Sequence, residues 1–178
     1  MRNLIIRNEL ESDYKAVEIL TREAFWNVNT PGCNEHYLVH VLRTHEDYIP
    51  ELDFVAEIDG EIVGHIIYSK AKLVDANGNT KNILTFGPLS VLPSYQRKGI
   101  GKALLNHSFT KALAMGYDMI VIFGHPSNYI ARGFKSCQKY NIYSPLIFIS
   151  SITLFNRRTT INIKLLLTCL IGFYFWCK

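Results

Sequence analysis

The stretch best suited to chemistry is "YQRKGIGKALL", residues 95–105, in which two glycines stand one residue apart among basic side chains. Backbone N–H groups in the first turn of a helix have no partner within the helix, and the helix dipole adds partial positive charge there. Glycine also lets an anion approach without meeting a Cβ atom. The stretch therefore favours a phosphate or pyrophosphate ligand, while tight packing of a helix on a sheet remains an alternative explanation for the glycines.

Single residues exclude two familiar phosphate-binding motifs at this turn. A P-loop has the pattern GxxxxGK[ST], but Gln96 stands where its first glycine belongs and Ala103 where its hydroxyl belongs. The dinucleotide fingerprint GxGxxG needs a third glycine, and that position is Leu104. ATP hydrolysis and NAD chemistry therefore lose support.

Before this turn the sequence predicts one strand, two helices and a hairpin. The apolar run at residues 3–7 predicts the first strand, and Ser12 is expected to cap the first helix. Residues 34–45 show the apolar spacing of a second helix. From residue 53 the period becomes that of strands, and Asp59-Gly60 predicts a two-residue hairpin loop.

Around the turn itself the sequence predicts a strand, a helix and a second strand. Residues 83–92 form the first of these strands, which should be bulged or splayed at Gly87-Pro88 because proline cannot donate a ladder hydrogen bond. Apolar residues then recur over about four helical turns, and Gly116 is a suitable C-terminal cap. The apolar run at residues 118–124 is typical of a buried strand. The unit is a βαβ crossover with its glycines at the helix N-terminus.

These features resemble the GNAT superfamily of acetyl-CoA-dependent N-acetyltransferases, whose pyrophosphate loop has the form Q/R-x-x-G-x-G/A. The pattern is Gln96-Arg97-Lys98-Gly99-Ile100-Gly101 here, with "GPLSVLP" before it and "NYIARGF" after it. The order of elements also matches over roughly residues 3–140. The resemblance implies an α/β (α+β) fold, with a mixed, mostly antiparallel central sheet flanked by helices.

The resemblance also implies which residues hold acetyl-CoA. The strand at residues 83–92 would bind the acetyl carbonyl and pantetheine through backbone groups, and the turn at residues 96–101 would hold the pyrophosphate. Tyr129 matches the family's usual general acid, a phenol close to the CoA sulfur, although a packing aromatic is an alternative. The implied cofactor-binding residues are Leu89, Ser90, Val91, Gln96, Arg97, Lys98, Gly99, Ile100, Gly101, Lys102 and Asn128.

The general base and the acceptor stay unassigned at this stage. The strand before the turn has no carboxylate, and a water chain could replace a side-chain base. In the family the two early helices and their loop form one wall of the acceptor site, which corresponds to residues 25–42. Candidate bases are Glu57, Glu35, His65 and His125, and candidate acceptor-wall residues are Trp26, Glu35 and His36.

Composition and charge restrict the class of protein. The chain has 178 residues, 48% hydrophobic and 19% charged, as expected for a globular domain. Its net charge of +4 is uneven: residues 1–118 carry 15 acidic against 12 basic groups, and the last 60 carry seven basic groups and no acid. This pattern argues against a nucleic-acid surface. Four dispersed cysteines predict free thiols with no metal site, and a cytoplasmic monomer or homodimer is expected.

The final segment, residues 143–178, does not fit the rest of the chain. It has no acidic residue or histidine and is dense in Ile, Leu, Phe, Thr and Ser. Its two long uncharged runs, residues 143–156 and the later 165–177, are 14 and 13 residues, whereas a helix needs about 20 to span a bilayer. No membrane attachment is therefore expected. The other two interpretations are completion of the sheet by strands at 146–155 and 160–167, and a non-native reading frame, which we favour.

The sequence therefore predicts an acetyltransferase domain over residues 1–142 and an atypical apolar, basic tail over 143–178. The expected activity is transfer of an acetyl group from acetyl-CoA to a primary amine of a small molecule or peptide by direct attack. The alternative is a catalytically impaired or non-catalytic acyl-CoA-binding module. An incomplete sheet would expose an edge and apolar surface, so poor folding or weakened activity is expected if the tail is not native.

Overall fold

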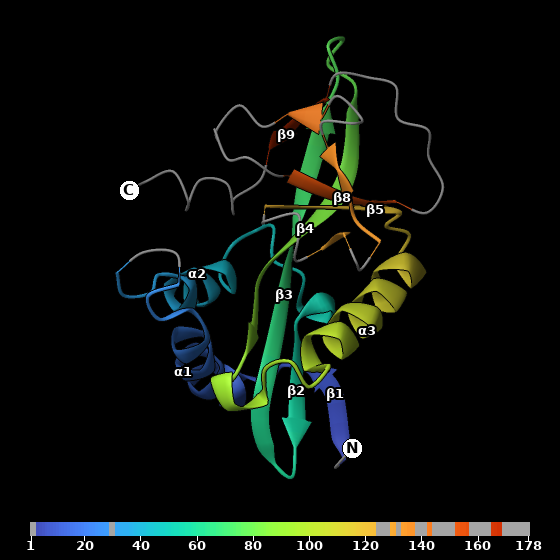
Figure 1. Cartoon of the computed structure of the whole chain (residues 1–178). Helices are drawn as coiled ribbons and strands as arrows, with labels where there is room; N and C mark the ends of the chain where they lie inside the picture. The colour runs from blue at the N-terminus through green and yellow to red at the C-terminus, as the bar shows by residue number, and fades with distance from the viewer. Residues whose placement is uncertain are drawn as a thin grey trace. The chain divides into compact units, whose positions relative to one another are not determined.

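The chain divides into two compact units, and Figure 1 labels their helices and strands. Unit 1 comprises Met1–Tyr68 and Gly87–Met115, and unit 2 comprises Ser69–Phe86 and Gly116–Lys178. The computed structural model describes residues 3–28, 31–123, 129–130, 133–137, 142–143, 152–156 and 165–168. Asn128 and His125 lie outside the described residues. Two strands, β3 (Glu61–Val74) and β4 (Thr80–Val91), contribute residues to both units.

Unit 1 is built on antiparallel strands. β1 (Leu4–Asn8) pairs with β2 (Phe54–Ile58), and β2 pairs with β3. Asp59 and Gly60 join β2 to β3 with φ angles of 53° and 84°. Two consecutive positive φ angles are those of a type I′ turn, whose twist matches that of the flanking strands. The predicted hairpin is confirmed.

Three helices complete unit 1: α1 (Tyr14–Phe25), α2 (Glu35–Leu42) and α3 (Ile100–Ala114). Short 3₁₀ turns lie at Glu11–Asp13, Pro50–Leu52 and Pro93–Tyr95. The buried positions follow the helical period, and they include Val17, Leu20, Leu38, Leu42, Leu104 and Leu105. The predicted helices are present, and the apolar face of each contributes to the core.

The predicted cap of the first helix is wrong. Ser12 is exposed, and the turn before α1 is fixed by Asp13, whose Oδ2 accepts the backbone N–H of Leu10 at 2.9 Å. Arg7 donates to the same carboxylate, with Nη1 at 2.6 Å and Nη2 at 3.1 Å. Because the Arg7 guanidinium of β1 donates two hydrogen bonds to it, the Asp13 carboxylate holds the turn more strongly than a solvated serine hydroxyl would.

The sheet and α3 approach each other closely at Gly64 of β3. A Cβ atom at this position would lie 3.0 Å from Ile100 Cγ2, 3.1 Å from Leu104 Cδ1 and 3.4 Å from Ala56 Cβ. Interiors are packed densely enough that such a methyl group forces its neighbours to move. The absence of a side chain at Gly64 therefore lets the first turns of α3 lie directly on the sheet.

We expect Gly64→Val to lower the free energy of unfolding by about 1–3 kcal/mol, the usual cost of overpacking a core. Gly101→Ala is the matched control, because its Cβ would meet Leu89 and Val91 at an ordinary 3.8 Å. Urea unfolding of both variants measures the difference. Equal stability of the two would show that α3 does not depend on the glycine of β3.

Unit 2 contains the remaining strands. β5 (Met119–Phe123) runs parallel to β4, with Leu84 opposite Ile120, and its residues are buried up to Ile122. β8 (Ile152–Asn156) pairs antiparallel with β5 and with β6 (Lys135–Ser136). β9 (Leu165–Thr168) pairs antiparallel with β3 and parallel with β7 (Ile142–Tyr143). The parallel β4–β5 pair with α3 between them in sequence confirms the predicted βαβ crossover.

Two further expectations concern β4 and the last segment. β4 continues as a strand through Gly87-Pro88, where the peptide bond is cis and Gly87 has φ 152°. The mixed, mostly antiparallel sheet confirms the predicted fold class. Strands β8 and β9 overlap the ranges proposed for sheet completion and each end one residue beyond them, whereas the domain boundary at residue 143 stays a prediction. No helix among the described residues has the length and apolar character needed to cross a bilayer.

Candidate functional site

The turn at residues 96–102 forms the N-terminus of α3 in unit 1. Gly99 is the N-cap, with φ 87° and ψ −2°, a left-handed conformation that glycine adopts without steric cost. Its carbonyl accepts the N–H of Ala103 at 3.0 Å, the first bond of the helix. The N–H groups of the first turn therefore have no partner within the helix and can bind an anion. The exposed members of the turn are Gln96, Arg97, Lys98, Gly99 and Lys102.

The structure gives different explanations for the glycine at position 99 and the glycine at position 101. Gly99 is required by its backbone angle, and a Cβ there would meet nothing within 4 Å. Gly101 has no positive φ angle, and a Cβ on it would make only ordinary contacts with the protein. Tight helix-to-sheet packing thus explains neither glycine, because that role belongs to Gly64. The anion-binding interpretation of the turn gains support from this difference.

The loop before α3 is held by its own side chains. The Gln96 amide donates from Nε2 to the Val91 carbonyl at 3.1 Å. The Tyr95 hydroxyl donates to Glu61 Oε2 at 2.8 Å, and Lys98 Nζ lies 5.2 Å from the centre of the Tyr95 ring. Gln96 therefore shapes the turn, whereas Arg97, Lys98 and Lys102 supply its positive charge. Ile100 is only 3% exposed, so its side chain belongs to the core and only its N–H can face a ligand.

The end of β4 presents backbone groups on two edges. Leu92 N–H bonds to the Val63 carbonyl of β3 at 3.0 Å, whereas the Val91 carbonyl accepts from Gln96. Backbone groups of successive strand residues point to opposite edges, so those of Leu89 and Val91 face away from β3 and those of Ser90 face toward it. The Ser90 hydroxyl is buried and donates to Thr21 Oγ1 at 3.0 Å. The geometry favours Leu89 and Val91 as pantetheine donors over Ser90.

Tyr129, the predicted general acid, lies in unit 2. Its ring makes edge contacts with Phe86 and Phe134, at centroid distances of 6.2 and 5.5 Å. Phe86 and Phe134 also contact each other at 6.3 Å. These contacts fix the ring of Tyr129, and its role in catalysis stays a prediction.

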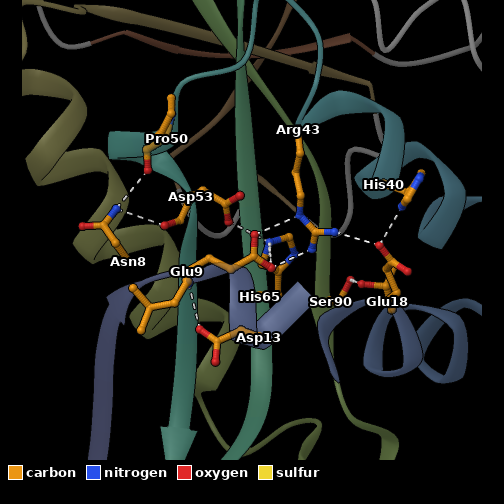
Figure 2. A network of polar contacts seen from close by, with 12 residues as sticks. Asn8, Glu9, Asp13, Glu18, His40, Arg43, Pro50, Asp53, His65 and Ser90 are labelled. Carbon is orange, nitrogen blue, oxygen red and sulfur yellow. Dashed lines mark hydrogen bonds and ion pairs between the residues drawn. The ribbon is translucent and has the colours of Figure 1, made fainter. Parts of the chain in front are cut away.

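A buried polar cluster at the ends of β1 and β2 was not predicted from the sequence (Figure 2). Arg43, just after α2, donates to both oxygens of Glu9, from Nη2 at 2.6 Å and Nε at 3.0 Å. His65 Nε2 lies 2.8 Å from Asp53 Oδ1 and 3.9 Å from Glu9 Oε1. The Tyr48 hydroxyl donates to the other oxygen of Asp53 at 2.9 Å. The side chains of Glu9 and His65 are fully buried, and Arg43 is 4% exposed.

Burial sets the proton affinities of this cluster. It raises the pKa of Glu9 to about 7, assisted by the Asp53 carboxylate and opposed by His65 and Arg43. Burial acts on Asp53 in the same direction, but its contacts with His65, Glu9 and Tyr48 outweigh it and lower the pKa of Asp53. Glu9 therefore keeps a proton at a pH where Asp53 has lost its own.

The same cluster could place three ligand atoms around a cation. Oxygens of Glu9 and Asp53 and a nitrogen of His65 lie within 4.8 Å of one another. The Arg43 guanidinium, however, already binds both Glu9 oxygens, so a cation would have to displace a buried positive charge. The donor set does not fit a metal site, and we assign none to it.

The structure places Glu57, Glu35 and Trp26 in local contacts, whereas His36 Nδ1 is buried and has no hydrogen-bond partner among the described residues. Glu57 Oε2 accepts from Arg7 Nε at 3.1 Å, and Glu35 Oε2 accepts from the Asn34 N–H at 3.1 Å and the Cys33 thiol at 3.3 Å. Glu35 thus closes the first turn of its own helix. Trp26 is exposed and lies under Arg22. Of the four cysteines, Cys33 and Cys137 are buried thiols, and burial raises the pKa of both.

Comparison with known proteins identifies the family. Residues 16–136 match the Acetyltransferase (GNAT) family. The chain is 32% identical over 101 residues to the uncharacterized N-acetyltransferase YjhQ of Escherichia coli (strain K12), a match that covers 56% of this chain and 55% of that relative. The match thus spans about half the length of this curated relative.

Two solved structures share the fold at lower identity. A GNAT family acetyltransferase from Brucella melitensis in complex with acetyl-CoA has a TM-score of 0.73 at 24% identity, covering 97% of this chain and 99% of that one. The GNAT family N-acetyltransferase YhbS from Escherichia coli in complex with CoA has a TM-score of 0.83 at 22% identity, covering 98% and 93%. The family match extends over most of the chain and includes the β4–turn–α3 region, so this protein belongs to the acetyltransferase (GNAT) family.

Proposed function

We propose that this protein transfers an acetyl group from acetyl-CoA to a primary amine of a small molecule or peptide, and that residues 1–142 carry the activity. The observation that supports this most directly is the exposed N-terminus of α3, with Gly99 in a left-handed cap and two lysines in the turn. Unpaired N–H groups, a helix dipole and flexible cations match a pyrophosphate group. Solved relatives of the same fold contain acetyl-CoA or CoA.

Each group of the proposed site has one task in the reaction. The pyrophosphate would lie on the turn, bound by backbone N–H groups of Gly99, Ile100 and Gly101 and by the charges of Arg97, Lys98 and Lys102. Pantetheine and the acetyl carbonyl would bind at Leu89 and Val91, on the edge of β4 that faces away from β3. Their N–H groups are suited to stabilise the oxyanion that forms when the amine attacks.

The transfer is one addition followed by one elimination. The neutral amine nitrogen attacks the thioester carbon, and the C–S bond breaks as the tetrahedral intermediate collapses. The amine loses a proton to a base, and the leaving thiolate gains one from an acid. We assign the acid to Tyr129 and leave the base unassigned. His65 is an unsuitable base because it is fully buried and bonded to Asp53.

A thiol-release assay with a panel of primary amines tests the proposed transfer. The expected result is amine-dependent release of CoA thiol from acetyl-CoA. Since burial raises the pKa of Cys33 and Cys137, these two thiols should react slowly with the reagent and add little background. Binding of CoA without release for any amine would favour the non-catalytic acyl-CoA-binding alternative.

We expect Tyr129→Phe to lower the turnover number by about 10²–10⁴-fold, the usual contribution of general acid catalysis. The affinity for CoA should stay almost unchanged, because the substitution removes only the hydroxyl and keeps the ring that packs on Phe86 and Phe134. Steady-state rates and a CoA titration of the same preparation measure both quantities. Unchanged turnover would remove Tyr129 from the mechanism and leave it a packing residue.

A further inference from the structure

The buried cluster of Glu9, Arg43, Asp53 and His65 connects α2 to the sheet of unit 1. Arg43 is the C-cap of α2, and its guanidinium lies 4.0 Å from the centre of the Tyr14 ring of α1. Its Nη1 donates to Glu18 Oε1 at 2.8 Å, and His40 Nδ1 lies 3.0 Å from the same oxygen. Arg43 therefore connects the end of α2 to α1 and to Glu9, the residue that follows β1 (Figure 2).

The charges within the buried part of this cluster do not balance when both carboxyl groups are ionised. Arg43 supplies one positive charge, whereas Glu9 and Asp53 would supply two negative ones. A second proton on His65 could restore neutrality, but it would have to sit on Nδ1. That atom is buried and has no hydrogen-bond partner in the described part of the chain, so a proton there would be an unsatisfied donor.

A proton on Glu9 balances the cluster without this penalty. The Glu9 carboxyl then donates to the Asp53 carboxylate, an interaction that raises the pKa of Glu9 and lowers the pKa of Asp53. His65 Nε2 donates to Asp53 Oδ1, and Tyr48 donates to Oδ2. The charged and titratable groups that face Glu9 are Arg43 from the end of α2, Tyr48 from the following loop, Asp53 before β2, His65 of β3, and Tyr14 and Glu18 of α1.

We propose that Glu9 and Asp53 share one buried proton, and that the opening of α2 away from the sheet releases it. When Arg43 leaves, water reaches Glu9 and the carboxyl returns to its ordinary acidity. The closed state therefore binds one proton more than the open state over the range between the two pKa values of Glu9. This inference concerns only the contact between α2 and the sheet of unit 1. It does not depend on the proposed acetyl transfer.

The sign of the effect follows from linkage. The pKa of Glu9 is about 7 in the closed state and 4.5 in its unperturbed state. A raised pKa contributes stability that is complete below the lower value and lost as the pH rises through the higher one. We therefore expect α2 to open more often as the pH rises from 5 to 7. Release of one proton limits the slope to a tenfold increase in the opening constant per pH unit.

Hydrogen–deuterium exchange of the full chain at several pH values tests the proposal, after correction for the intrinsic exchange rates. Peptides from α2 should lose protection by up to tenfold per pH unit between 5 and 7 in the unaltered protein. Peptides from α3, on the other face of β3, are the internal control and should not change in this way. In Glu9→Gln the pH dependence of protection in α2 should disappear. Glu57→Gln makes the same substitution at a partly exposed carboxyl group, and there the pH dependence should remain.

Protection of α2 that does not change with pH in the unaltered protein, or a dependence that survives in Glu9→Gln, would overturn the proposal. Carbon-13 NMR of the glutamate carboxyl groups gives a second measurement that needs no variant to fold. One glutamate should titrate far above the others, near pH 7. Titration of every glutamate carboxyl near its ordinary value would equally contradict a buried shared proton.

Discussion

Arg43→Met is expected to lower the free energy of unfolding by about 3–5 kcal/mol, the range found when one partner of a buried ion pair is removed, because Arg43 supplies the positive charge that balances the single negative charge of the Glu9–Asp53 pair. The guanidinium is 4% exposed, and its partner carboxyl on Glu9 is fully buried. Methionine keeps most of the aliphatic stem that covers Tyr14 but supplies no donor. The two bonds to the fully buried Glu9 carboxyl group are lost without replacement by solvent, and one bond to the partly exposed Glu18 is lost as well.

The matched control for this prediction is Arg7→Met. Arg7 also binds a carboxylate with two nitrogens, Asp13 at 2.6 and 3.1 Å, but its side chain is 32% exposed. Partly exposed pairs are screened by water, so we expect a loss of about 1 kcal/mol or less. Urea unfolding with circular dichroism measures both variants. Equal losses would mean that burial does not determine the strength of the Arg43 contacts.

The double variant Lys98→Glu, Lys102→Glu is expected to weaken CoA binding at least about 100-fold, since two charge-assisted bonds of about 1.5–3 kcal/mol each are lost. Both lysines are exposed at the N-terminus of α3, where the helix dipole also favours an anion. The substitutions reverse the charge of the turn while leaving Gly99 and the backbone N–H groups in place. The effect should decrease at high salt because the lost interaction is electrostatic.

A control with the same net charge separates a local from a general effect. Lys15 of α1 and Lys111 near the end of α3 are also exposed, and Lys15→Glu, Lys111→Glu changes the total charge by the same amount. We expect this control to keep the CoA affinity within a few-fold. Similar losses in both double variants would indicate general attraction of an anion by the protein, with no defined site at the turn.

Local signals made several elements of both units predictable. Asp59-Gly60 specifies the hairpin because both residues tolerate the positive φ angles of a type I′ turn. Gly99 marks the start of α3, and a run of buried apolar residues gives β5. The cap of α1 was assigned to Ser12 from its type alone, and the structure uses Asp13 because Arg7 approaches from the neighbouring strand.

The buried cluster could not be predicted, because its members are distant in sequence. Glu9 and Arg43 are 34 residues apart and Asp53 and His65 are 12 apart, so no spacing rule connects them. One local signal was present: His65 stands in the middle of an apolar strand, where a buried polar group needs a partner. Likewise, only the structure shows that Gly64, and neither glycine of the turn, is needed for tight packing of α3.

The proposed function depends on binding of the CoA pyrophosphate at the N-terminus of α3. Calorimetric titration of the unaltered 178-residue chain with CoA tests this binding most directly, after circular dichroism has shown a cooperative unfolding transition. We expect saturable binding of one CoA per chain, with an affinity for CoA that falls when salt is added. A folded protein that gives no saturable binding of CoA would contradict both the proposed acetyl transfer and the non-catalytic alternative.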